Sequence, residues 1–200
     1  MPNPSSAIGA GSKPTPPRRK PLRLREYNYA QAGMYFVTIC VKNRTCLFGE
    51  ITDSTMCLSA SGAQLLAVWH ELPEHYPNVE LGQFVIMPNH FHGILALEAD
   101  PIAKNRSSQV EGGVNTAPNR QPLSEIVRAL KTYSARRINV AMGTSGVALW
   151  QRNYYEHVIR NELDYDRIVE YIVNNPAQWE LDSLNPACRD VLMADKSGRV

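Results

Sequence analysis

The chain has 200 residues, of which 44% are hydrophobic, and a formal net charge of +2 at pH 7. This length and composition predict one globular domain with tails or one large loop, and the small net charge does not by itself indicate a nucleic-acid partner. The sequence contains no run of 18 apolar residues and begins without the apolar segment of a secretory signal, so we expect neither a membrane span nor export.

The cysteines show no metal-binding or disulfide framework. They stand at positions 40, 46, 57 and 188, and no two of them form a CxxC pair. We therefore expect buried, reduced thiols and a cytoplasmic location.

The chain divides into a central domain and two tails. Residues 1–22 are rich in Pro, Ser and Gly with little apolar content, which predicts a disordered basic tail. We expect the domain to cover residues 23–180 and to be followed by a C-terminal tail over 181–200.

The first elements of the domain are a strand and a helix. Residues 34–41 are dense in β-branched and aromatic side chains and predict a buried strand, and a short second strand or extended piece is expected at 46–48. A helix capped by Ser59 or Ser61 should follow, with prolines at 73 and 77 marking its end.

Two strands are expected next, over 79–87 and 90–97, joined by a Pro-Asn turn. Residues 99–122 carry Gly-Gly, three prolines and no periodicity, and predict a long flexible loop. The helix after this loop begins at Ser124 and should turn Ile126, Leu130 and Tyr133 toward the core.

The last elements are a strand over 154–159 and a helix over 162–174, which is capped by Asn161 and ended by Pro176. The order is strand, helix, strand, strand, helix, strand, helix. It predicts an α+β fold, namely the ferredoxin-like split βαβ antiparallel sheet with an added C-terminal helix.

Basic side chains concentrate in two places. One group lies near the N-terminus and the other in the helix after the loop; they comprise Arg18, Arg19, Arg23, Arg25, Arg128, Lys131, Arg136 and Arg137. Such groups release counterions when they neutralise phosphates, so they are candidates for DNA-backbone contacts. They could equally solvate a tail and one helix face.

His90 and His92 form an HxH pair on a predicted strand. Side chains at i and i+2 project from the same face, so both imidazoles can bind one divalent cation while Phe91 packs on the opposite side. Two ligands leave coordination positions open, as catalysis requires. The pair could instead be ordinary surface or hydrogen-bonded histidines.

Tyr171 and Asn175 are four residues apart in the last helix and share one face. The core side of that helix is better supplied by Tyr165, Ile168 and Ile172. Asn175 could offer an amide oxygen to a metal, and a phenol becomes a good nucleophile beside a cation. The alternative is a half-buried tyrosine with an Asn near the helix end.

Two stretches resemble a known family. Val85-Ile-Met-Pro-Asn-His-Phe-His-Gly-Ile94 resembles the HUH motif of the single-tyrosine transposases of small insertion sequences. Trp150-Gln-Arg-Asn-Tyr-Tyr-Glu-His-Val-Ile-Arg-Asn161, with Tyr171-Ile-Val-Asn-Asn-Pro176 after it, resembles the REP-associated tyrosine transposase branch.

The resemblance implies Tyr171 as the nucleophile and His90, His92 and Asn175 as ligands of Mg²⁺ or Mn²⁺. It implies a transposase that cleaves and rejoins single-stranded DNA near hairpins through a 5′-phosphotyrosine link, as a monomer or homodimer. A domesticated, non-catalytic hairpin binder and a phosphodiesterase with a water nucleophile are the alternatives. The aromatic residues Trp150, Tyr154 and Tyr155 could stack unpaired bases or pack in the core.

Overall fold

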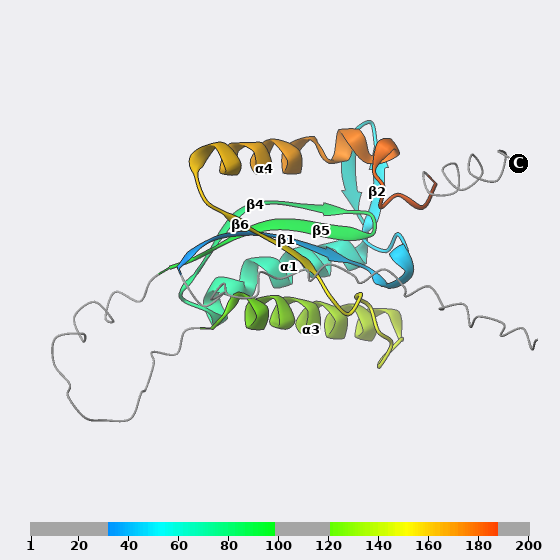
Figure 1. The fold of residues 1–200 in the computed structure, drawn as a ribbon. Helices are drawn as coiled ribbons and strands as arrows, with labels where there is room; N and C mark the ends of the chain where they lie inside the picture. Colours follow the sequence, from blue (N-terminus) through cyan, green and yellow to red (C-terminus); the bar gives the residue numbers. More distant parts are fainter. Residues whose placement is uncertain (1–31, 99–120, 188–200) are drawn as a thin grey trace, which may run out of the picture.

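One four-stranded antiparallel sheet separates the helices into two layers (Figure 1). The computed structural model describes residues 32–98 and 121–187. The expected N-terminal tail, with Arg18, Arg19, Arg23 and Arg25, lies outside the described residues, as do positions 99–120 of the expected loop and 188–200. The described elements, in chain order, are β1 (Gly33–Cys40), η1 (Lys42–Arg44), β2 (Gly49–Thr52), β3 (Thr55–Leu58), α1 (Ala60–His75), β4 (Val79–Met87), β5 (His90–Leu97), α3 (Leu123–Met142), β6 (Tyr155–Ile159), α4 (Glu162–Asn174) and η2 (Pro176–Leu181).

The strand order of the sheet is β4-β5-β1-β6, with every neighbouring pair antiparallel. This is the order expected of a split βαβ unit, in which β5 and β1 occupy the centre. Helices α1 and α3 cover one face, and α4 covers the other (Figure 1). The predicted α+β, ferredoxin-like fold with an added C-terminal helix is confirmed.

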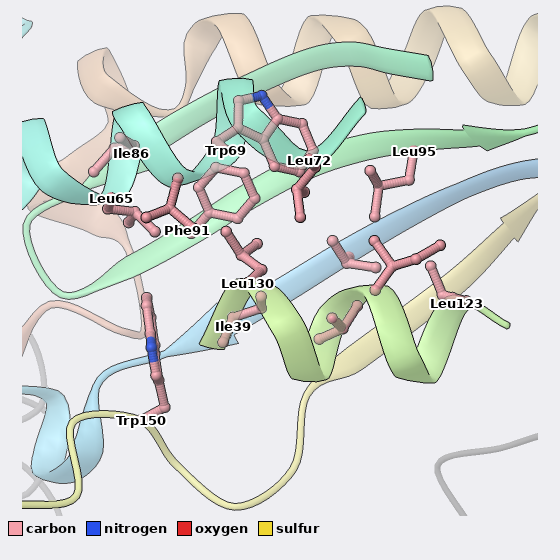
Figure 2. Close-up of a cluster of buried hydrophobic side chains, with 14 of the residues drawn as sticks. Ile39, Leu65, Trp69, Leu72, Ile86, Phe91, Leu95, Leu123, Leu130 and Trp150 are labelled. Carbon is pink, nitrogen blue, oxygen red and sulfur yellow. The ribbon is translucent and has the colours of Figure 1, made fainter. Parts of the chain in front are cut away.

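The larger core lies between the sheet and the α1–α3 layer. Alternate residues of the two central strands enter it, including Ile39, Phe91 and Leu95, which are fully buried. Figure 2 shows them packed against Trp69 of α1 and Leu130 of α3. Because successive side chains point to opposite faces, this packing turns the residues between them toward α4.

The smaller core lies under α4. It contains Phe36, Ile94 and Ile159 from the sheet, with Ile168 and Ile172 from the helix. The prediction that Ile168 and Ile172 face the core is therefore confirmed, and Tyr165 packs partly buried against the same cluster.

Several local predictions differ from the structure. Residues 46–48, expected as a short strand or extended piece, lie outside any strand, and the β2–β3 hairpin that follows them was not expected; its turn residues Asp53 and Ser54 have φ of 49° and 60°. A turn of this kind usually carries glycine, so its sequence signal is weak. Pro73 lies inside α1 rather than ending it, because a proline in the last turn removes only one backbone hydrogen bond. Tyr133 was expected in the core but is 48% exposed.

The cysteines differ too. Cys46 and Cys57 are exposed and Cys40 is half-buried, so the expectation of buried thiols is wrong for these three, which are all unpaired.

Among the described residues, no helix is both long and apolar enough to cross a bilayer.

Candidate active site

The two histidines lie on the α4 face of β5. His90 is fully buried and His92 is 2% exposed. Cross-strand pairing sets His92 opposite Thr38 of β1 and Val85 of β4, so the central position of β5 fixes the backbone on both sides. The ring centroids of the two histidines are 4.6 Å apart. The HxH spacing thus brings both imidazoles together, as predicted.

Asn89 fixes the orientation of the His90 ring. Its Nδ2 donates to the backbone oxygens of Arg44 (3.0 Å) and Leu184 (2.8 Å), which leaves its Oδ1 to face Nδ1 of His90 at 2.8 Å. An amide oxygen only accepts, so Nδ1 of His90 carries the proton and donates. The lone pair of His90 therefore lies on Nε2, the atom that faces the site.

His92 is held in a similar way from β1. Its Nδ1 lies 2.8 Å from Oγ1 of Thr38, and its Nε2 lies 3.3 Å from the hydroxyl of Tyr171. Phe36 stacks on the ring at a centroid distance of 5.4 Å. These contacts direct Nε2 of His92 toward the last helix.

Local contacts position α4 above the sheet. The side chain of Asn161 accepts from the backbone N–H of Asp164 at the start of the helix, as its sequence predicts. Asp164 also lies 2.8 Å from Nε2 of His157 on β6. The buried Ile168 and Ile172 then fix the rotation of the helix.

This rotation brings Tyr171 to the histidines. Its ring lies 5.2 Å from that of His92 and 6.1 Å from that of Phe36, and the residue is 44% exposed. One turn later, Asn175 is 5% exposed, and its Oδ1 has no hydrogen-bond partner. The structure therefore brings all four predicted residues, His90, His92, Tyr171 and Asn175, into one cluster.

The surroundings keep both histidines neutral. Burial lowers the pKa of His90 from 6.5 to about 4, against the opposing effect of the nearby Asn175 side chain. Burial and the neighbouring His90 lower the pKa of His92 well below its ordinary value. Neutral imidazoles are the form that binds metal ions.

Tyr171 is a protonated phenol in these surroundings. Burial raises its pKa above 10, and the Asp182 carboxylate acts in the same direction, whereas the Asn175 side chain lowers it. A nearby cation would be required to favour the phenolate.

The chain resembles proteins of known sequence and structure. No family model matches it. An uncharacterized protein of Haemophilus influenzae is 38% identical over 167 residues, which cover 83% of this chain and 92% of the relative. A second H. influenzae protein, provisionally named a REP-associated tyrosine transposase, is 28% identical over 152 residues, or 76% and 74% of the two chains.

The chain is similar to the REP-associated tyrosine transposases, as its motifs predict. A solved member of this family, bound to a REP hairpin, covers 78% of this chain and 73% of its own, with a TM-score of 0.52 and 24% identity. That level of identity shows a shared fold.

The predicted basic helix lies away from the cluster. α3 is on the opposite face of the sheet from α4 (Figure 1), and three of its four predicted cations already have protein partners. Arg128 pairs with Glu125, and Arg137 binds both carboxylate oxygens of Glu71. Lys131 donates to the backbone oxygens of Gln151 and Arg152 at 2.7 and 3.1 Å. Of the four predicted α3 cations, Arg136 is the exposed one without an ion pair in the described structure.

The three aromatic candidates for stacking on unpaired bases differ in how exposed they are. Trp150 is 8% exposed and donates from Nε1 to the Ser134 hydroxyl at 3.1 Å, and Tyr154 packs against the same core. Tyr155 is 49% exposed on the α4 face and lies edge-on to Phe36. Tyr155 alone of the three has a ring available to a base.

Thr38, Asn89 and Asp182 take part in the site but were not predicted as site residues. Asn89 stands inside the HxH segment, where its position next to His90 was a usable signal. Thr38 shares the face of Phe36 by strand alternation. Asp182 has no local signal, because only the fold brings it to His90.

Acidification should destabilise the metal-free protein. The unfolded chain takes up a proton on His90 between pH 6.5 and about 4, whereas the folded chain does not. The free energy of unfolding should therefore fall by about 2 kcal/mol between pH 6.5 and 5 through His90 alone. Urea denaturation in EDTA measures this, and His90→Gln should show a drop smaller by that amount. An equal drop in both proteins would mean that His90 is charged in the folded state.

Removing the Asn89 amide should loosen His90 and the segment after η2 together. Asn89→Ala leaves two partly buried carbonyls and one buried imidazole N–H without partners, a loss of roughly 3 kcal/mol. Urea denaturation measures the stability, and ¹⁵N NMR of the imidazoles should show a mixture of His90 tautomers. The matched change Asn174→Ala, at an exposed site, should cost under about 0.5 kcal/mol. A single unchanged His90 tautomer in Asn89→Ala would refute the role of Asn89.

Proposed function

We propose that this chain cleaves and rejoins single-stranded DNA near hairpins, with Tyr171 as the nucleophile and a divalent metal at His90, His92 and Asn175. The main observation in support is that the Tyr171 hydroxyl lies 3.3 Å from Nε2 of His92. The hairpin carried by the solved family member supports the same class of DNA for this chain.

The residues present fit a divalent cation. Nε2 of His90 and Oδ1 of Asn175 are buried without hydrogen-bond partners. Within 32–98 and 121–187, no group of three or more His, Cys, Asp or Glu side chains already has the spacing of a metal site, so the two histidines need either a further ligand that moves closer or one of another kind, such as the Asn175 amide. Imidazole and amide donors suit Mn²⁺, and phosphate oxygens suit Mg²⁺ or Mn²⁺. When bound, the ion would polarise the phosphate and offset the charge that develops on it.

Tyr171 would carry the covalent step. Its oxygen attacks the phosphorus, the phosphodiester bond to a 3′-oxygen breaks, and the DNA is left joined to the enzyme by a 5′-phosphotyrosine. The phenol proton leaves and the 3′-hydroxyl takes one up. One phosphodiester replaces another, so a second 3′-hydroxyl can reverse the step and join strands without ATP.

The geometry supports action within one chain. Tyr171 and His92 in contact belong to the same polypeptide, with α4 covering its own sheet (Figure 1). A monomer could therefore hold a complete site, although a homodimer is equally compatible with this arrangement.

The DNA would follow the β6 edge of the sheet. Tyr155 on β6 could stack an unpaired base beside the site, and Arg136 on α3 could contact phosphates on the other face. Arg128, Lys131 and Arg137 would have to exchange their present partners for phosphate.

A labelled single-stranded hairpin incubated with Mn²⁺ tests the nucleophile. The protein should form a denaturation-resistant DNA adduct, which Tyr171→Phe should abolish and His90→Ala should strongly reduce. Tyr155→Phe and Tyr165→Phe serve as matched controls and should retain the adduct. Cleavage without an adduct in Tyr171→Phe would favour a water nucleophile, and binding without any cleavage by the unaltered protein would favour a non-catalytic hairpin binder.

Arg136 should contribute to hairpin binding through its charge. Arg136→Gln should weaken binding a few-fold and reduce the slope of log affinity against log salt by about 1. Arg137→Gln is the control, because the Arg137 guanidinium is paired with Glu71 and should affect the slope less. Fluorescence anisotropy over a salt series measures both, and an unchanged slope in Arg136→Gln would remove Arg136 from the interface.

A further inference from the structure

Asp182 lies directly beside the histidine pair. It follows η2, and its Oδ2 is 3.7 Å from Nε2 of His90. The side chain is only 12% exposed, and Oδ2 makes no hydrogen bond. The separation is too long for a hydrogen bond.

Three buried atoms without hydrogen bonds come from three separate elements. They are Nε2 of His90 on β5, Oδ1 of Asn175 at the end of α4 and Oδ2 of Asp182 after η2. Each presents a lone pair, because Asn89 holds the proton of His90 on Nδ1. Acceptors cannot satisfy one another, and burying them unpaired is costly. A cation bound between them would satisfy all three.

The backbone around Asp182 is firmly anchored. Oδ1 of Asp182 accepts from the N–H of Leu184 at 2.7 Å. The carbonyls of Ser183 and Leu184 accept from Arg44 and Asn89 at 2.7 and 2.8 Å. The same Asn89 side chain therefore fixes both His90 and the segment that carries the carboxylate.

We propose that Asp182 supplies a carboxylate ligand to the divalent metal of this site. The proposal rests on the proposed function, since it concerns the same ion. Two ligands of one ion at about 2.1 Å each lie roughly 3–3.5 Å apart, so the 3.7 Å separation of Asp182 and His90 needs little adjustment.

A carboxylate changes the chemistry of the ligand set. Two imidazoles and an amide oxygen are neutral, whereas Asp182 adds one negative charge and a hard oxygen, which raises affinity for Mg²⁺ and Mn²⁺. Without the cation, the same charge would repel a phosphate.

Calorimetric titration of the DNA-free protein with Mn²⁺ tests the proposal. Asp182→Asn keeps the Oδ1 acceptor for Leu184 and should weaken Mn²⁺ binding about tenfold or more. Asp166→Asn removes the same charge from an exposed site on α4 and should bind as the unaltered protein does. His92→Ala should lose binding.

The possible results distinguish the role of Asp182 from the existence of a metal site at the histidines. Binding by Asp182→Asn equal to that of the unaltered protein, with loss in His92→Ala, would overturn the role of Asp182 and leave the histidine site standing. Absence of Mn²⁺ binding by the unaltered protein would overturn both. Urea denaturation in EDTA checks folding, and Asp182→Asn should be at least as stable because it removes an unpaired buried charge. The gain in melting temperature on adding Mn²⁺ is a second readout and should be smaller in Asp182→Asn.

Discussion

The side-chain amide of Asn89 joins three parts of the molecule that are distant in sequence. Its two N–H groups bind the carbonyl of Arg44 after β1 and that of Leu184 after η2, and its oxygen accepts from His90. The buried amide therefore determines which nitrogen of His90 faces the site and where the chain beyond α4 is held. The positions of Asn175 and Asp182 relative to the histidines depend on the same docking.

The two faces of the sheet differ in role: one buries the larger core, and the other carries the candidate site residues. The α1–α3 face buries the larger apolar core, which holds β1 and β5 in register (Figure 2). The α4 face carries His90, His92 and Tyr171 over a small core, whose aromatic member Phe36 contacts both His92 and Tyr171. Burial keeps the imidazoles neutral but also raises the pKa of the phenol. A bound cation would resolve this conflict, because neutral imidazoles bind metal ions and the positive charge would favour the phenolate.

Features encoded by local pattern were predictable from the sequence. The alternation of β5 put His90 and His92 on one face, and the Asn161 cap with Ile168 and Ile172 set the rotation of α4 that exposes Tyr171. Features that depend on contacts between distant segments were not predictable. Tyr133 is exposed because of how α3 meets α1, the β2–β3 turn lacks a glycine signature, and Asp182 reaches His90 only through Asn89 and Arg44. The cations of α3 could be counted in the sequence, but their partners Glu71 and the carbonyls of Gln151 and Arg152 could not.

In the proposed reaction, the hydroxyl oxygen of Tyr171, which lies against His92, becomes joined to DNA. Mass spectrometry of the proteolysed covalent complex measures this directly, since the peptide that carries the nucleotide can be fragmented to the modified residue. We expect a nucleotide on Tyr171. A nucleotide on Tyr154, Tyr155 or Tyr165 would contradict it, because none of these three is the tyrosine that contacts His92 in the structure.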